Sequence, residues 1–164
     1  MAAGSTYTPI ATTTLSSTST DVQFSSISSA YTDLVLVIDG KDTTSTYSPY
    51  IQFNGDTTTN YSITNLYGTG SAAASNRSSS TSTPYLGSLG TSRGNMIIQI
   101  QNYANTTTYK TALVRINAAD FRTYASVVLW RKTPEAINRV NIKMEASGNF
   151  AIGSTFTLYG IAAA

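Results

Sequence analysis

The closing stretch of the chain, from Asn138 to Ala164, restricts the fold more than any other segment. Its first half alternates apolar and polar residues with a period of two, which is typical of a β-strand with one face in solvent. Ser147-Gly148-Asn149 then predicts a turn. The apolar positions of the first half are Val140, Ile142 and Met144, and the polar ones are Arg139, Asn141, Lys143 and Glu145.

The second half of this stretch predicts a strand over Thr155–Ile161, so that the two halves form a final strand pair. Phe156 and Leu158 share one face of this strand, while Tyr159 and Ile161 lie on the other. A strand that is apolar on both faces is expected inside a sandwich or against a neighbouring subunit.

The rest of the chain predicts more strands, and no segment of useful length has the periodicity of a helix. We expect a single all-β domain over residues 1–164, with residues 1–6 as a short lead, folded as a two-sheet antiparallel sandwich. A jelly roll is the preferred architecture, with an immunoglobulin-like sandwich as the alternative. The predicted strands are Tyr7–Leu15, Asp21–Ile27, Tyr31–Gly40, Tyr50–Phe53, Tyr61–Gly68, Asn95–Asn102, Tyr109–Ala118 and Tyr124–Arg131, with Pro84–Gly94 as a further short candidate.

Several segments predict turns, loops and an edge. Pro9 cannot donate a hydrogen bond to a neighbouring strand, so the first strand is expected at the edge of a sheet. Asn54-Gly55-Asp56 is a strong turn signal. Lys41–Pro49 and Thr69–Thr83 are polar, and we expect both to be exposed loops.

Charge and residue types exclude several classes of function. Only 11% of the residues are charged and the net charge is +2, without a concentrated basic stripe, so nucleic-acid binding is not expected. The chain contains neither histidine nor cysteine, which removes the commonest general base and thiolate chemistry. No stretch approaches the roughly 18 apolar residues of a membrane span, and no signal peptide is expected.

Few side chains suggest catalysis or ligand binding. Asp39 and Asp42 are the closest pair of carboxylates, but both have the character of turn residues. A calcium site from Asp39, Asp42 and Asp56 is a minority alternative, because their spacing matches no calcium loop. Gly68-Thr69-Gly70 lacks the continuation of a phosphate-binding loop. We therefore predict no catalytic, cofactor-binding or metal-binding residue.

The aromatic residues can be read as core or as contact surface. Trp130 lies in the middle of a predicted strand, where a core position is favoured over a sugar platform. Tyrosines are enriched where one part of the side chain is buried and the other is in contact with solvent. Most of the tyrosines here are expected to pack at the edge of the core with their hydroxyls in water. Those near strand ends and loops are Tyr47, Tyr50, Tyr61, Tyr67, Tyr85, Tyr103, Tyr109 and Tyr124.

Three segments carry a resemblance to known proteins: YTPIATTTL at the start, FSSISSAYTDLVLVI from Phe24 to Ile38, and GNFAIGSTFTLYGIAAA from Gly148 to Ala164. Together they resemble a group of small virion proteins encoded by tailed bacteriophages. The closing motif is the most specific of the three. The chain has Ala162 where the group commonly has a lysine, and Ser28-Ser29-Ala30 where a proline is common.

The resemblance implies a non-enzymatic β-sandwich on the outer surface of the virion, made in the host cytoplasm. The first alternative is a capsid decoration, or cement, protein that binds the major capsid protein of the head shell as a small homo-oligomer, with a trimer expected. The second is a tail-fibre or tail-tip component that binds tail proteins and contacts host glycans through Lys41–Pro49 and Thr69–Thr83, since such loops are adaptable contact surfaces. Neither implies a membrane, a nucleic acid or a cofactor. An enzyme is a distant third, because no catalytic constellation is present.

Overall fold

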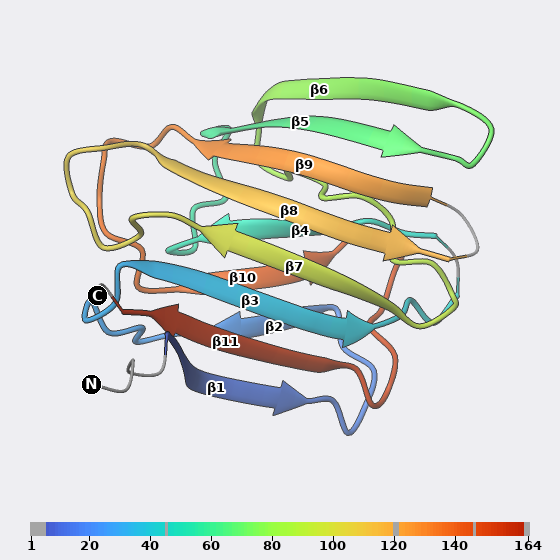
Figure 1. Cartoon of the computed structure of the whole chain (residues 1–164), viewed down its shortest axis with the longest axis horizontal. Helices are drawn as coiled ribbons and strands as arrows, with labels where there is room; N and C mark the ends of the chain where they lie inside the picture. Colours follow the sequence, from blue (N-terminus) through green and yellow to red (C-terminus); the bar gives the residue numbers. More distant parts are fainter. Residues whose placement is uncertain (1–5, 45, 120–121, 146, 163–164) are drawn as a thin grey trace.

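The computed structural model describes residues 6–44, 46–119, 122–145 and 147–162, and these residues form eleven β-strands (Figure 1). The described residues form no helix, and hence none that is long and apolar enough to cross a membrane. The strands are β1 Tyr7–Thr14, β2 Asp21–Phe24, β3 Asp33–Gly40, β4 Pro49–Phe53, β5 Tyr61–Gly68, β6 Ala73–Thr81, β7 Gly94–Ile100, β8 Lys110–Ala118, β9 Arg122–Trp130, β10 Val140–Met144 and β11 Thr155–Ile161.

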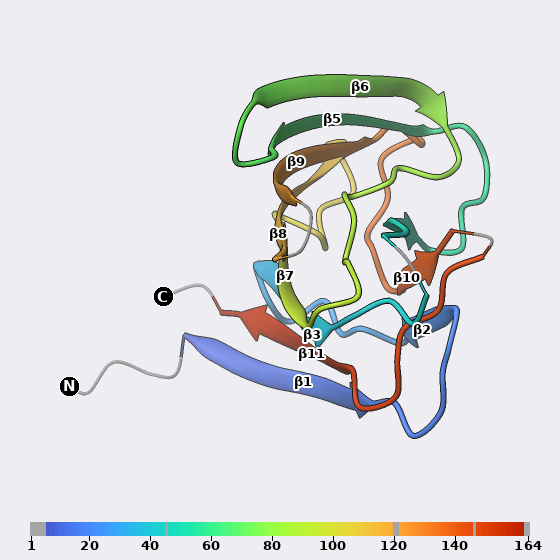
Figure 2. The same ribbon diagram turned by 90° about the vertical axis from the view of Figure 1, so that its right-hand side faces the viewer.

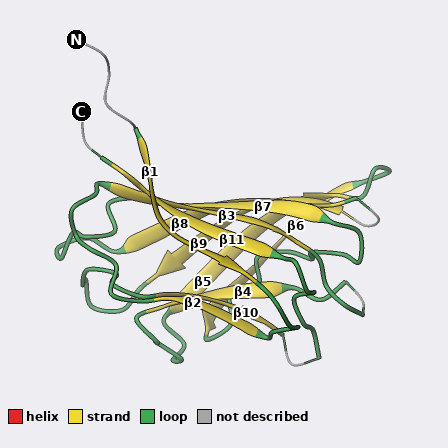
Figure 3. Ribbon diagram, turned by 90° about the horizontal axis from the view of Figure 1, so that it is seen from below, coloured by secondary structure: helices red, strands yellow, loops and turns green. Residues whose placement is uncertain are grey.

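The strands form two antiparallel sheets packed face to face, which confirms the predicted all-β sandwich (Figures 2 and 3). The large sheet has the order β1-β11-β3-β7-β8-β9-β5-β6, and the small sheet has the order β2-β10-β4. Most neighbouring strands are not consecutive in the chain, as in the Greek-key connections of jelly rolls. The division into eight and three strands differs from the four and three of a constant-type immunoglobulin domain.

The core fills the space between the two sheets with side chains from alternate positions. Met96, Ile98 and Ile100 of β7 are fully buried, as their period-two spacing predicts. The same alternation supplies buried residues from β3, β5, β8, β9 and β11 of the large sheet, and the small sheet supplies the facing residues. Further buried members include Leu34, Leu36, Ile38, Ile51, Phe53, Val114, Val128, Val140, Ile142, Phe156 and Leu158.

Strand β11 lies inside the large sheet, between β1 and β3, as its two-sided apolar pattern predicts. Leu158 is the direct partner of Leu36 on β3, and both are fully buried. The three segments that carry the phage resemblance supply these three adjacent strands. They are therefore neighbours in space, although the last is separated from the others by most of the chain.

The predicted pairing of the last two strands is wrong. β10 lies in the small sheet between β2 and β4, whereas β11 lies in the large sheet. The chain between them crosses one end of the sandwich, and Phe150 in this connection is fully buried with its ring against Phe156, 5.0 Å between centroids. Two segments of alternating apolar and polar residues, separated by a turn signal, have the sequence pattern of a hairpin. Here the two strands belong to different sheets, and each sheet turns its apolar face to the shared core.

The predicted loop Thr69–Thr83 contains a nine-residue strand, Ala73–Thr81, so that prediction is wrong as to structure. It is right as to exposure, because eight of the nine residues are exposed. β6 is an edge strand paired only with β5. Because β6 covers no core on either face, its sequence does not alternate between apolar and polar residues. This alternation is the pattern by which strands are predicted, so β6 was not predicted as a strand.

The segment Pro84–Gly94 contains no strand before Gly94, apart from a single bridge between Tyr85 and Tyr50. It instead inserts Leu86 and Leu89, both fully buried, into the core. The remaining predicted strands are present with ends shifted by a few residues. β1 is an edge strand as predicted, and its pairing with β11 shifts register between Pro9 and Ala11.

Candidate functional site

The outer face of the large sheet, which is the face turned away from the small sheet, exposes large apolar side chains. Leu66 on β5, Val127 on β9 and Leu113 on β8 are 58%, 47% and 45% exposed. The three strands are neighbours, and Val127 is the direct cross-strand partner of Leu113. Apolar groups on adjacent strands, unlike single scattered ones, indicate a surface that contacts another molecule.

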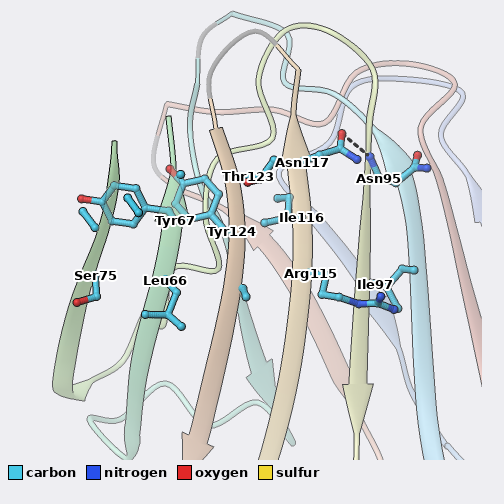
Figure 4. Close-up of a pocket in the computed structure, with 14 residues that line it drawn as sticks. Leu66, Tyr67, Ser75, Asn95, Ile97, Arg115, Ile116, Asn117, Thr123 and Tyr124 are labelled. Carbon is cyan, nitrogen blue, oxygen red and sulfur yellow. Dashed lines mark hydrogen bonds between the residues drawn. The ribbon is translucent and has the colours of Figure 1, made fainter. Parts of the chain in front are cut away.

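A groove of about 940 Å³ lies on this face, across one end of β6, β5, β9, β8 and β7 (Figure 4). We refer to it as the outer groove. Its floor follows one row of cross-strand partners, from Leu66 to Ala125, Arg115 and Ile97. Among the lining residues, Gly68, Ala73 and Ala125 have side chains no larger than a methyl group. The lining residues are Leu66, Tyr67, Gly68, Ala73, Ala74, Ser75, Asn95, Ile97, Arg115, Ile116, Asn117, Thr123, Tyr124 and Ala125.

Arg115 is the only charged residue among those that line the outer groove. Its side chain extends over the floor towards Ile97 (Figure 4). Within the part of the chain that the structure describes, Arg115 has neither a salt bridge nor a hydrogen bond. Asn95 and Asn117 lie at the end of the groove, where the Asn95 backbone N–H donates to Asn117 Oδ1 at 3.4 Å. Apart from this one unpaired cation, the groove is lined by apolar and uncharged polar residues.

A second, smaller cavity of about 280 Å³ lies on the opposite face of β5 and β6. We refer to it as the inner cavity. Figure 2 shows the chain after β6 crossing on the small-sheet side of β5 and β9, and Thr83, Tyr85 and Gly87 of this segment line the cavity. The lining residues are Ser48, Ile63, Asn65, Asn76, Arg77, Ser78, Thr83, Tyr85, Gly87, Arg122 and Tyr124. Several of them come from the two segments predicted to be contact loops, Lys41–Pro49 and Thr69–Thr83.

The carboxylates considered for catalysis or calcium have structural partners instead. Asp39 is paired with Arg93, at 2.6 Å from its Nε. Asp42 is buried and accepts hydrogen bonds from the backbone N–H groups of Thr44 and Tyr47, at 3.2 and 3.1 Å, as expected of a residue that closes a turn. No group of three or more potential metal-ligating side chains occurs among the described residues.

Asp56, the third residue of the calcium alternative, anchors the β4–β5 loop to the core. Its carboxylate accepts hydrogen bonds from Trp130 Nε1 at 2.8 Å, Asn60 Nδ2 at 2.9 Å and the Thr58 backbone N–H at 2.9 Å. Burial would raise the pKa of Asp56, but hydrogen bonds from Thr58, Asn60 and Trp130 outweigh it and lower this pKa to about 2. Trp130 is 2% exposed, so it is a core residue, as predicted.

The tyrosines divide into core and surface residues. Tyr61 and Tyr103 are exceptions to the expectation for most tyrosines, because both are almost fully buried and their hydroxyls are hydrogen-bonded to the protein. The Tyr61 hydroxyl accepts from the Phe53 N–H at 2.9 Å, and the Tyr103 hydroxyl donates to the Ser28 carbonyl. Burial raises the pKa of both. Tyr85 and Tyr109 are exposed, at 39% and 59%.

Lys110 is a buried cation that sequence analysis did not identify. It is 1% exposed, and its Nζ donates to the carbonyls of Asn105 and Thr108, each at 2.6 Å. Burial lowers its pKa, against an opposing effect of Glu135. The lysine therefore holds the β7–β8 loop together and takes no part in either pocket.

Sequence analysis missed the outer groove and the inner cavity, although one signal for the outer face was present. Val127 and Leu129 lie opposite Val128 and Trp130 in a two-sided apolar strand, and the structure leaves Val127 in solvent. No local signal indicates the pockets, because each is assembled from segments that are far apart in sequence.

No protein-family model matches the sequence, and no curated protein matches it. Among solved structures, the chain is similar to galectin LEC-6 of Caenorhabditis elegans, with 11% identity, a TM-score of 0.37, and coverage of 89% of this chain and 94% of that one. It is also similar to protein SO2946 of Shewanella oneidensis, of unknown function, with 10% identity, a TM-score of 0.30, and coverage of 96% and 77%. At these identities and TM-scores, neither likeness supports an inference about function.

Proposed function

We propose that the protein is a non-enzymatic structural protein of a tailed-phage virion, and that it decorates the outer surface of the head shell. The observation that best supports this proposal is the uncovered apolar outer face of the large sheet, around Leu66, Leu113 and Val127. A free monomer gains nothing from leaving such side chains in water, whereas a protein held on a shell buries them against its partner.

The position of the resembling segments supports the same proposal. They supply β1, β11 and β3, which form one continuous part of the large sheet. Residues that resemble a family only in scattered places would not be expected to form a single structural unit. In this proposal the partners are the major capsid protein and further copies of this chain, arranged as a small oligomer, with a trimer as the first expectation.

The contact is proposed to depend on apolar and neutral polar groups. The outer groove is lined by one cation and no carboxylate, and the exposed apolar residues Leu66, Leu113 and Val127 lie in or beside it on adjacent strands. Salt screens charge interactions beyond about 3 Å at 1 M ionic strength but leaves apolar contacts in place. The protein is therefore expected to stay on the particle in about 1 M salt.

Cryo-electron microscopy of the intact particle tests the location. The proposal predicts density for this sandwich on the head lattice, with the outer face of the large sheet turned towards the shell. Density at the tail would instead support the alternative, a tail component that contacts host glycans. Density on the head with the outer face in solvent would contradict the role proposed for that face.

A binding assay with undecorated shells tests the surface itself. The double variant Leu113→Lys, Val127→Asp places two charges in the contact and is expected to lower occupancy at least tenfold, while the isolated protein stays folded because both side chains are exposed and the opposite charges face each other across the strands. Ser29→Asp, in the exposed β2–β3 loop, is the matched control and is expected to bind as the unmodified protein does. Equal binding by the double variant would contradict the proposal.

A further inference from the structure

We propose that the inner cavity binds a single monosaccharide unit. This inference does not depend on the proposed virion function, because it concerns the opposite face of β5 and β6. Asn65 and Asn76 point to the cavity side, whereas their neighbours Leu66 and Ser75 belong to the outer groove. A molecule bound through its outer face therefore leaves the inner cavity open.

Two amide side chains provide the polar part of the site. Asn65 on β5 and Asn76 on β6 are direct cross-strand partners, and Asn65 Nδ2 donates to Asn76 Oδ1 at 3.0 Å. The same Nδ2 lies 3.5 Å from the carbonyl oxygen of Tyr85. Both contacts fix the plane of the Asn65 amide, so its orientation is set before any ligand arrives.

The other end of the Asn65 amide lacks a partner. Asn65 is 8% exposed, and its Oδ1 accepts no hydrogen bond from the part of the chain that the structure describes. A buried acceptor without a donor is unfavourable, and a hydroxyl group that enters the cavity would supply that donor. This is the polar requirement that a sugar, with several hydroxyl donors, is well suited to satisfy.

Two tyrosine rings provide the apolar part of the site. Tyr85 is 39% exposed and is held edge-on by Tyr50, 5.7 Å between ring centroids. Tyr124 packs against Tyr67 at 5.5 Å, and its ring lies so close to Gly87 that a side chain there would collide with it. Rings held in place in this way offer contact area at little cost in conformational entropy, and the C–H faces of a pyranose pack on such rings.

Size and charge restrict the ligand further. A volume of about 280 Å³ lies at the lower end of the range for small-molecule sites, which fits one sugar unit better than an enclosed chain of several. The lining residues include Ser78 and Thr83 but no carboxylate. Two cations, Arg77 and Arg122, also line the cavity, and the Arg122 guanidinium lies over the Tyr67 ring, at 4.8 Å from its centroid.

The experiment is a nuclear magnetic resonance titration of the isotope-labelled full chain with four separate probes. These are the methyl glycosides of glucose, galactose, mannose and N-acetylglucosamine. The inference predicts that at least one probe causes saturable shifts of the Asn65 and Asn76 side-chain amide signals. If none of the four causes a saturable shift, or if the shifts lie away from the inner cavity, the inference is overturned.

Three variants locate the binding and separate it from folding. Asn76→Ala and Tyr85→Ala each remove one exposed lining side chain and are each expected to raise the Kd of the bound glycoside about fivefold or more. Thr64→Ala is the matched control, because Thr64 is exposed on β5 next to Asn65 and is not among the residues that line the inner cavity. An unchanged Kd in both test variants, or an equal rise in Thr64→Ala, would overturn the assignment.

Discussion

Strands β11 and β6 belong to the same sheet, yet the protein uses them in opposite ways. β11 is hydrogen-bonded on both sides, to β1 and β3, and every second residue from Phe156 to Gly160 is buried. β6 is bonded on one side only, to β5, and eight of its nine residues are exposed. One is held by packing against the core, and the other by its pairing with a neighbour.

The comparison shows what each kind of strand contributes. A packed strand contributes stability, because its apolar side chains leave water and fill the core. A strand held only by pairing contributes surface, because its side chains need not match any core and are free to serve contacts. Both pockets are lined by residues of β6, and neither is lined by any residue of β11.

The largest expected difference comes from removing each strand in turn. A chain truncated after Ser154 loses Phe156, Leu158 and the pairing on both sides of β11, and we expect no soluble folded protein. Two buried large side chains alone are worth about 5–10 kcal/mol, which is comparable to the total stability of a domain. Circular dichroism and size-exclusion chromatography of the purified chain measure the outcome.

The variant to compare with this truncation keeps β11 and replaces β6, Ala73–Thr81, with a glycine–serine segment of equal length. This chain is expected to fold with a loss of about 1–3 kcal/mol, because only pairing with β5 is removed. A stable truncated chain, or an unfolded replacement, would show that the two strands do not differ in the way described.

Single side chains sharpen the same comparison. Leu158→Ala is expected to lower the free energy of unfolding by about 2–5 kcal/mol, since the fully buried site leaves a cavity. Leu66→Ala on β5, next to β6, is expected to change it by no more than about 0.5 kcal/mol, because Leu66 is 58% exposed. Urea denaturation of both variants measures this, and a similar loss in the two would be inconsistent with an uncovered outer face.

Two glycines test how closely each region is packed. A Cβ at Gly160 in β11 would lie 2.3 Å from the ring of Tyr31, so Gly160→Ala is expected to cost about 1–3 kcal/mol. A Cβ at Gly68 in β5 would meet no atom closer than 3.9 Å, so Gly68→Ala is expected to be neutral or stabilising by up to about 1 kcal/mol. Thermal unfolding compares them, and the opposite order of stability would refute the packing difference.

The last prediction concerns the β4–β5 loop, which joins the small sheet to β5, the strand that pairs with β6. Asp56→Asn weakens the hydrogen bonds that Asp56 accepts from Thr58, Asn60 and Trp130 and is expected to cost about 1–3 kcal/mol at neutral pH.

The effect of Asp56 depends on pH in a defined direction. Its folded pKa is lowered to about 2, below the unfolded value of roughly 3.9, so its stabilising contribution is fully present above pH 4 or so and is lost as the pH falls towards 2. The stability difference between the unmodified chain and Asp56→Asn should therefore narrow over this range in denaturation experiments. A difference that stays constant between about pH 5 and pH 2 would contradict the assigned pKa.

Much of the fold could be predicted from local sequence patterns. Alternation placed most of the strands and the inward-facing residues of β7, because burial of one face imposes a period of two. The turn at Asn54-Gly55 was also predictable, since both residues have a positive φ that these residue types tolerate best. Pro9 marked an edge strand because it has no N–H to donate.

Only the tertiary structure decided how these pieces combine. It separated β10 from β11, paired the uniform hydroxyl-rich segment Ala73–Thr81 with β5, and brought Ser48, Asn65 and Tyr85 around one cavity. Each of these outcomes depends on contacts between residues far apart in the chain. A local pattern reports which side of a strand is buried, but it contains no information on which strand lies beside it. The sequence alone therefore determined most of the strands but not β6, and the packing determined the sites.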